Sequence, residues 1–369
     1  MSGYHVGIPM LRLVSTWCAA LLLTCLLAPP GLAAQGGAGP AQVASSAPTR
    51  PTPDWQALQT RIARGEFAAV ITRLTELLRE PALAPADERQ ANLLLGAAYY
   101  GQHQYAAANP PLRRVLALDP GNHEAIKLLG LDDYFLGKPR EAVPYLEQAR
   151  QWMPGQVDLE YLLTVCYVLS GDQDGARAAA AHMLGLDPGT PAARLALARV
   201  LVQRQMEASA VHEVQQALAA DPTLPLAHYL LGVLDIVYGQ NEVARQEFAR
   251  EIALNPTYGN AFYRLGDAEY RLGHLPAART ALSRAIWLDP TYSGPYILMG
   301  KLLLQEPDPE LAARMLHRAT ELDPNNYDAH YLLGRALQQL QQPAAAAQEF
   351  ALSQKLRPKT EGNFGLDAR

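Results

Sequence analysis

The sequence predicts an all-α protein built from repeated helical hairpins, and three periodic columns of residues carry this prediction. A proline recurs every 34 residues through most of the chain. An alanine stands twelve residues before each of these prolines, and a glycine or another small residue stands twenty-four residues before it. The residue just ahead of the small one is leucine in seven of the eight periods. The prolines are Pro120, Pro154, Pro188, Pro222, Pro256, Pro290, Pro324 and Pro358.

Each column has a physical role in a pair of antiparallel helices. The small residue in the first helix and the alanine in the second let the two backbones approach closely. The proline ends the second helix, because it pushes the preceding residue out of the α region. Pro110 and Pro144 instead fall inside second helices, where we predict a late start or a kink. A further set stands where second helices are expected to begin and a missing N–H costs little, namely Pro139, Pro276, Pro309 and Pro343.

With these columns the chain resembles the tetratricopeptide repeat family, whose unit is a 34-residue helix–turn–helix. The resemblance implies a right-handed α-solenoid of stacked hairpins. It also implies a concave face that is lined by the first helices and holds peptides or partner domains. Eight repeats cover 89–360 and begin at Arg89, His123, Val157, Pro191, Pro225, Gly259, Ser293 and Tyr327.

The first 34 residues have the layout of a signal peptide. They hold a single charge, Arg12, followed by a mainly apolar run that ends at Pro29 and by the small residues Ala33 and Ala34. The run is shorter than the roughly 20 residues that a membrane-spanning helix needs. We therefore expect a cleaved signal in 1–34, with a short N-terminal anchor as the alternative, and an exported protein that is periplasmic or secreted.

Three further segments complete the predicted organisation. Residues 35–53 are rich in alanine, glycine, proline and serine, and predict a flexible tether. Residues 54–88 are expected to form a degenerate N-terminal repeat, because Gly65 and the residues after it match a turn and the start of a second helix. Residues 361–369 are expected to form a short C-terminal tail.

Composition and motifs exclude several classes of function. The net charge of −5 gives no strong positive field, so no nucleic-acid partner is expected. Cys18 and Cys25 lie in the signal segment, which leaves Cys166 as a core residue and no disulfide scaffold. The sequence has no His-x-x-x-His, Cys-x-x-Cys or Gly-x-Ser-x-Gly motif. We therefore expect no metal, no cofactor and no catalytic residues, and the chain is not expected to be an enzyme.

The resemblance places the second, fifth, ninth, twelfth and thirteenth residues of each repeat on the concave face. Tyrosines and cations at these positions would give a partner rigid aromatic anchors and adaptable polar contacts. Each tyrosine can instead pack against the next hairpin, and the cations can form a solvated face. The candidate partner-binding residues are Tyr100, Tyr134, Tyr161, Tyr229, Tyr263, Tyr270, Arg271, Lys301, Tyr331 and Arg335.

A protein-interaction function is the hypothesis that these features favour. Arrays that clamp the C-terminal carboxylate of chaperones pair a lysine at the fifth position with an asparagine at the ninth. Here the only such lysine, Lys127, is followed by Leu131, so no carboxylate-clamp chaperone binding is expected. We expect a non-enzymatic scaffold of the cell envelope that binds a peptide or partner protein. The alternative is a structural component that assembles through end-to-end or homo-oligomeric contacts.

Overall fold

The computed structural model describes residues 53–80, 83–306 and 308–357. Within these ranges the chain forms α-helices joined by turns, with no β-strand, which confirms the predicted all-α class. The helices belong to two compact units that divide between Gln205 and Met206. The division falls inside the fourth repeat, between its first helix and its second.

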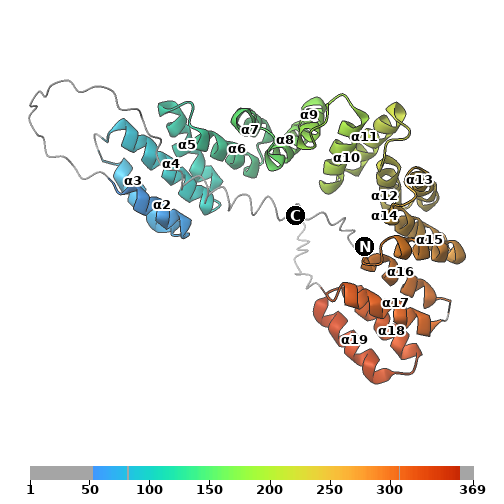
Figure 1. The fold of residues 1–369 in the computed structure, drawn as a ribbon. Helices are drawn as coiled ribbons and strands as arrows, with labels where there is room; N and C mark the ends of the chain where they lie inside the picture. The colour runs from blue at the N-terminus through green and yellow to red at the C-terminus, as the bar shows by residue number, and fades with distance from the viewer. Residues whose placement is uncertain (1–52, 81–82, 307, 358–369) are drawn as a thin grey trace, which may run out of the picture. The chain divides into compact units, whose positions relative to one another are not determined.

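Unit one is a succession of helical pairs, drawn from blue to green in Figure 1. Each pair packs within itself and against the next helix along the chain. The helices are α2 (Trp55–Ala63), α3 (Phe67–Leu78), α4 (Pro85–Gly101), α5 (Tyr105–Leu118), α6 (His123–Phe135), α7 (Pro139–Trp152), α8 (Val157–Ser170), α9 (Gln173–Met183) and α10 (Pro191–Gln203).

Unit two continues the same pattern of hairpins. Its pairs α12–α13, α14–α15, α16–α17 and α18–α19 each pack closely, and successive pairs contact each other. The helices are α11 (Glu207–Ala220), α12 (Ala227–Val237), α13 (Asn241–Leu254), α14 (Gly259–Arg271), α15 (Leu275–Leu288), α16 (Ser293–Leu303), α17 (Pro309–Leu322), α18 (Tyr327–Gln339) and α19 (Pro343–Leu356).

The glycine column sits where the two helices of a hairpin meet. A Cβ atom added at Gly130 or at Gly266 would lie 2.8 Å from a leucine side chain of the second helix, closer than real Cβ contacts come. The residue that fills this space stands sixteen positions after each glycine. The pairs are Gly96 with Leu112, Gly130 with Leu146, Gly232 with Phe248, Gly266 with Leu282, Gly300 with Leu316 and Gly334 with Phe350.

Prolines mark the ends of the second helices. Six of these helices stop two residues before the repeating proline, as α5 does at Leu118 before Pro120, with Pro358 lying outside the described residues. The helix α9 stops earlier, at Met183, where Gly185 turns the chain with a φ of +65°. The helices α7, α15, α17 and α19 all have proline at their first or second position, as expected.

The prediction for the interior prolines was wrong. The helix α5 runs unbroken through Pro110, and α7 begins at its expected place and runs through Pro144. Each proline leaves the carbonyl four residues earlier without its helical N–H, and these carbonyls belong to the exposed residues Ala106 and Arg140. Water can donate hydrogen bonds to these carbonyls, while fully buried side chains such as Leu112 hold the helix in place.

The repeat that was expected to begin at Pro225 has its first helix two residues later, at Ala227. Leu226 adopts a left-handed backbone with a φ of +68°. The buried carboxylate of Glu251, on α13, accepts hydrogen bonds from the Leu226 and Tyr229 backbone N–H groups at 3.0 and 3.2 Å. A side chain of the second helix thus replaces the usual local cap of the first.

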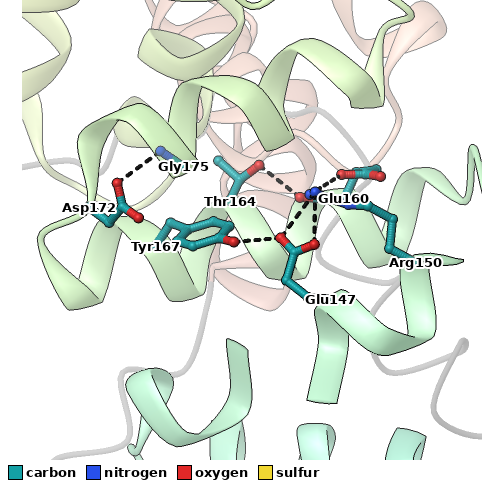
Figure 2. Close-up of polar contacts among 7 residues, drawn as sticks. All are labelled: Glu147, Arg150, Glu160, Thr164, Tyr167, Asp172 and Gly175. Carbon is teal, nitrogen blue, oxygen red and sulfur yellow. Dashed lines mark hydrogen bonds and ion pairs between the residues drawn. The ribbon is translucent and has the colours of Figure 1, made fainter. Parts of the chain in front are cut away.

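Polar side chains join α7 to α8 across the boundary between two repeats. Figure 2 shows Arg150 of α7 contacting Glu147 on its own helix and Glu160 of α8, the latter at 2.8 Å. Tyr167 of α8 donates a 2.5 Å hydrogen bond to Glu147. Burial and this carboxylate together raise the pKa of the Tyr167 hydroxyl. The network satisfies charges that hairpin stacking would otherwise bury alone.

Candidate partner-binding face

Four tyrosines and one arginine gather on or just before the first helices of unit two. We call this group the tyrosine cluster. Tyr229 lies on α12, and Tyr263 and Arg264 lie on α14. Tyr258 and Tyr292 stand immediately before α14 and α16. The rings meet edge to face, with centroids 5.2 Å apart for Tyr229 and Tyr258 and 5.4 Å apart for Tyr263 and Tyr292. The cluster therefore spans the two repeats that begin at Pro225 and Gly259.

Arg264 is the cation inside this cluster. Its guanidinium carbon lies 5.2 Å from the centroid of the Tyr263 ring. Burial by itself lowers the pKa of Arg264, but the phenol groups of Tyr229, Tyr263 and Tyr292 outweigh this effect and raise it. Among the described residues, no hydrogen-bond partner reaches its buried Nε atom. Arg264 thus remains positively charged beside the tyrosines, and its Nε–H donor has no hydrogen-bond partner among the described residues.

A second group of side chains lies on α14, α16 and α18, and we call it the cationic patch. Lys301 places its Nζ atom 5.0 Å from the centroid of the Tyr270 ring. Gln305 donates a 2.6 Å hydrogen bond from Nε2 to the Tyr270 hydroxyl. Arg335 is close enough to act electrostatically on the same hydroxyl, opposing the rise in its pKa that burial causes. Both cations are exposed, and so is the neighbouring Tyr331 of α18, at 49% of its surface.

An acid that acts on this region, Asp267, is paired with a neighbouring arginine. Asp267 of α14 accepts a 3.0 Å contact from Nε of Arg271, one turn along the same helix. Burial raises the pKa of Asp267, while the charges of Arg264 and Lys301 oppose this rise. The exposed Lys301 therefore lies near an acid that is already paired with Arg271.

Comparison with known families assigns the repeats. Family models described as tetratricopeptide repeat match residues 238–293, 297–359 and 136–183. The matches cover hairpins in both units. The chain is a tetratricopeptide repeat (TPR) protein. The first and second helices described above are therefore the two helices of a TPR hairpin.

Several solved TPR-type structures resemble the chain. MamA from Desulfovibrio magneticus matches with a TM-score of 0.42 and 19% identity, over 47% of this chain and 97% of that one. YrrB, described as a TPR protein with an unusual peptide-binding site, matches with a TM-score of 0.39 and 22% identity, over 46% and 87% of the two chains. The Cut9–Hcn1 assembly of the APC/C matches with a TM-score of 0.42 and 21% identity, over 76% of this chain and 55% of that one. No curated protein sequence matches the chain.

The candidate residues of unit one lie in a different setting. Tyr100 is 4% exposed and packs edge to face against Tyr105, 5.5 Å away, so it offers a partner almost no surface. Tyr134 is half-buried and contacts Phe135. Tyr161 is also half-buried, and burial raises the pKa of its hydroxyl. Tyr161 lies close enough to Tyr134 and to Arg204 for both to act on its hydroxyl, and Arg204 opposes the rise in its pKa.

Sequence reasoning missed three members of the tyrosine cluster. Tyr258 and Tyr292 each follow a Pro-Thr pair at the same point of the TPR period, so the repeated Pro-Thr-Tyr was a usable signal. Arg264 occupies the sixth position of its repeat, which is leucine in most of the others. A charged residue in an otherwise apolar column is the pattern that would have identified it.

The described part of the TPR protein shows no other assembled chemistry. In residues 53–80, 83–306 and 308–357, no group of three or more histidine, cysteine or acidic side chains is arranged to hold a metal ion. Cys166 is fully buried, as expected of a core residue, and burial raises the pKa of its thiol to about 12. None of the helices described is long and apolar enough to cross a membrane.

Proposed function

We propose that this TPR protein is a non-enzymatic scaffold that binds an extended segment of a partner protein on the first-helix face of unit two. The observation that supports the proposal is the arrangement of Tyr270, Lys301, Tyr331 and Arg335 on three consecutive first helices. Lys301 and Arg335 are exposed, and Tyr331 presents half of its aromatic surface. Aromatic and arginine side chains of this kind dominate the binding energy of protein interfaces.

Selection from a library of random peptides tests the proposal with the full chain. We expect enrichment of peptides whose binding weakens about tenfold in a Tyr331→Ala variant, since an exposed aromatic anchor contributes about 1–2 kcal/mol. Trp287→Ala is the matched control, because Trp287 is a 68% exposed aromatic on the second helix α15. Fluorescence anisotropy measures both variants. Failure to enrich any peptide, or equal loss of binding in the two variants, would contradict the proposal.

We also propose that residues 1–34 direct export of the scaffold. Their single arginine, apolar run and small residues support this assignment, and they lie outside the described residues. N-terminal sequencing of the protein recovered from an envelope fraction is expected to begin close to Gln35. An intact N-terminus on protein found only in the cytoplasm would contradict it.

A further inference from the structure

Several cations in unit two have an acidic partner. Arg245 pairs with Glu242, Arg250 with Glu247, and Arg279 with Glu306. Lys301 and Arg335 are among the cations of this unit that have no such partner, since in the described residues no carboxylate lies within ion-pair distance of either one. Lys301 acts electrostatically on Asp267, but that carboxylate is already paired with Arg271.

The two cations also stand in register. Both occupy the ninth position of their repeats, on the neighbouring first helices α16 and α18. Packed helices lie about 8–10 Å apart, and an extended chain advances about 3.3 Å per residue. Charges presented in this way match acidic side chains about two or three residues apart on an extended segment.

Neighbouring side chains support Lys301, and a second cation lies near the acid Asp267. The Tyr270 ring beneath Lys301 is fixed by the hydrogen bond from Gln305, so the ammonium has a defined support. The half-buried Arg264 acts on the same acid, Asp267, as Lys301 does. The chain as a whole carries a net charge of −5, so this positive region is local and not a general property of the molecule.

Exposed rings adjoin the cations. Tyr331 is 49% exposed on α18, and Tyr292 is 37% exposed at the start of α16. They offer surface for the uncharged residues of a bound segment. We infer that the cationic patch recognises acidic side chains, two or three residues apart, in an extended segment of a partner protein, a proposal that rests on the proposed function above.

The test uses the full chain and two fluorescein-labelled peptides that differ only in having glutamate or glutamine at alternate positions, with leucine and serine between them. We expect the glutamate peptide to bind at least about tenfold more tightly than the glutamine peptide, and added salt to reduce the difference. The double variant Lys301→Glu, Arg335→Glu is expected to abolish this preference and to favour a lysine peptide.

Arg314→Glu provides the matched control. Arg314 is an exposed arginine on the second helix α17, and in the described part of the chain no ion pair involves it. The control is expected to bind the glutamate peptide as the unchanged protein does. Equal loss in the control and in the double variant would overturn the inference, because a general charge effect would then explain the binding.

Other outcomes separate this inference from the function on which it rests. Peptides that bind through Tyr331 but show no preference for glutamate, or no response to reversal of Lys301 and Arg335, would overturn the inference and leave the scaffold function standing. An absence of any peptide binding would contradict both. Tighter binding of a labelled single-stranded oligonucleotide than of the glutamate peptide, lost in the double variant, would also overturn the choice of an acidic protein segment.

Discussion

Asp132 is a single side chain whose burial shapes the stability of unit one. It lies on α6 at a repeat position where other repeats have Ala98, Cys166 or Ala268. The residue is fully buried, and within the described ranges no hydrogen-bond partner reaches either carboxylate oxygen. Burial, together with the charge of Asp133, raises the pKa of this carboxyl to about 8.

This raised pKa predicts a stability that falls with increasing pH. Between about pH 4 and pH 8 the folded state keeps the proton on Asp132 and the unfolded state loses it, so the free energy of unfolding decreases as pH rises through this window. Asp132→Ala is expected to flatten the decrease and to stabilise the protein at pH 8 by about 1–3 kcal/mol. Urea unfolding followed by circular dichroism at several pH values measures both effects.

Asp174→Asn serves as the control for this prediction. Asp174 lies in the same unit with a side chain that is 89% exposed. Its substitution is expected to leave the pH profile of the wild-type protein unchanged. A profile that stays steep in Asp132→Ala would show that another group is responsible.

At the scale of the element, the ends of helices follow local sequence more closely than their interiors do. The 34-residue proline column marks the ends of the second helices, because the constraint on the residue before proline acts locally. The start of α12 at Ala227 depends instead on Glu251, a residue of the next helix, and no local pattern predicts it. The unbroken course of α5 likewise depends on the tertiary packing of Leu112, which outweighs the local cost of proline.

Replacing an interior proline is expected to stabilise its helix. Pro110→Ala restores an N–H that can bond to the Ala106 carbonyl, and we expect a gain of about 1–2 kcal/mol after the added entropy of the unfolded chain is subtracted. Pro343→Ala, at the first position of α19, restores an N–H that the helix cannot use. Thermal unfolding of both variants measures the contrast. A lower melting temperature for Pro110→Ala than for the unchanged protein would contradict this account.

At the scale of the whole molecule, helices pack against their near neighbours in sequence within the described part of the chain. In the described part, the helices that pack together are adjacent or next-adjacent in sequence. Stability in such an array is a sum of local and nearest-neighbour contributions. Damage to one hairpin is therefore expected to remain local in its effects.

Leu316→Ala tests this locality. Leu316 of α17 is fully buried against Gly300, and its truncation is expected to cost about 2–5 kcal/mol. Amide hydrogen exchange is expected to speed up in α16, α17 and α18 while α4 and α5 keep their protection. Leu352→Ala, at a 42% exposed leucine of α19, should leave exchange unchanged. A uniform increase across all helices would contradict the linear picture.

The candidate face could be predicted from the sequence only in part. The repeat register indicated Tyr229, Tyr263 and Tyr270 as candidates, because the family resemblance places the fifth and twelfth positions on the concave face and helical periodicity puts them on one side of a first helix. It could not show that Tyr258 and Tyr292, the last residues of their repeats, fold back against Tyr229 and Tyr263. Nor could it show that Arg264 lies close to Tyr229 of the preceding repeat. Periodicity specifies which side a residue occupies, whereas contacts between repeats depend on the distance and rotation from one hairpin to the next.

The half-buried Arg264 has a consequence for how the repeats align during folding. Hairpins that share the same glycine, alanine and leucine columns are nearly interchangeable, so a folding chain can dock a hairpin on the wrong neighbour. Tyr229 of the preceding hairpin helps to stabilise the Arg264 charge, and we expect docking that skips a repeat to lose this contact. We therefore expect the arginine to favour the correct alignment of otherwise similar repeats, much as a single buried polar residue sets the alignment of a coiled coil.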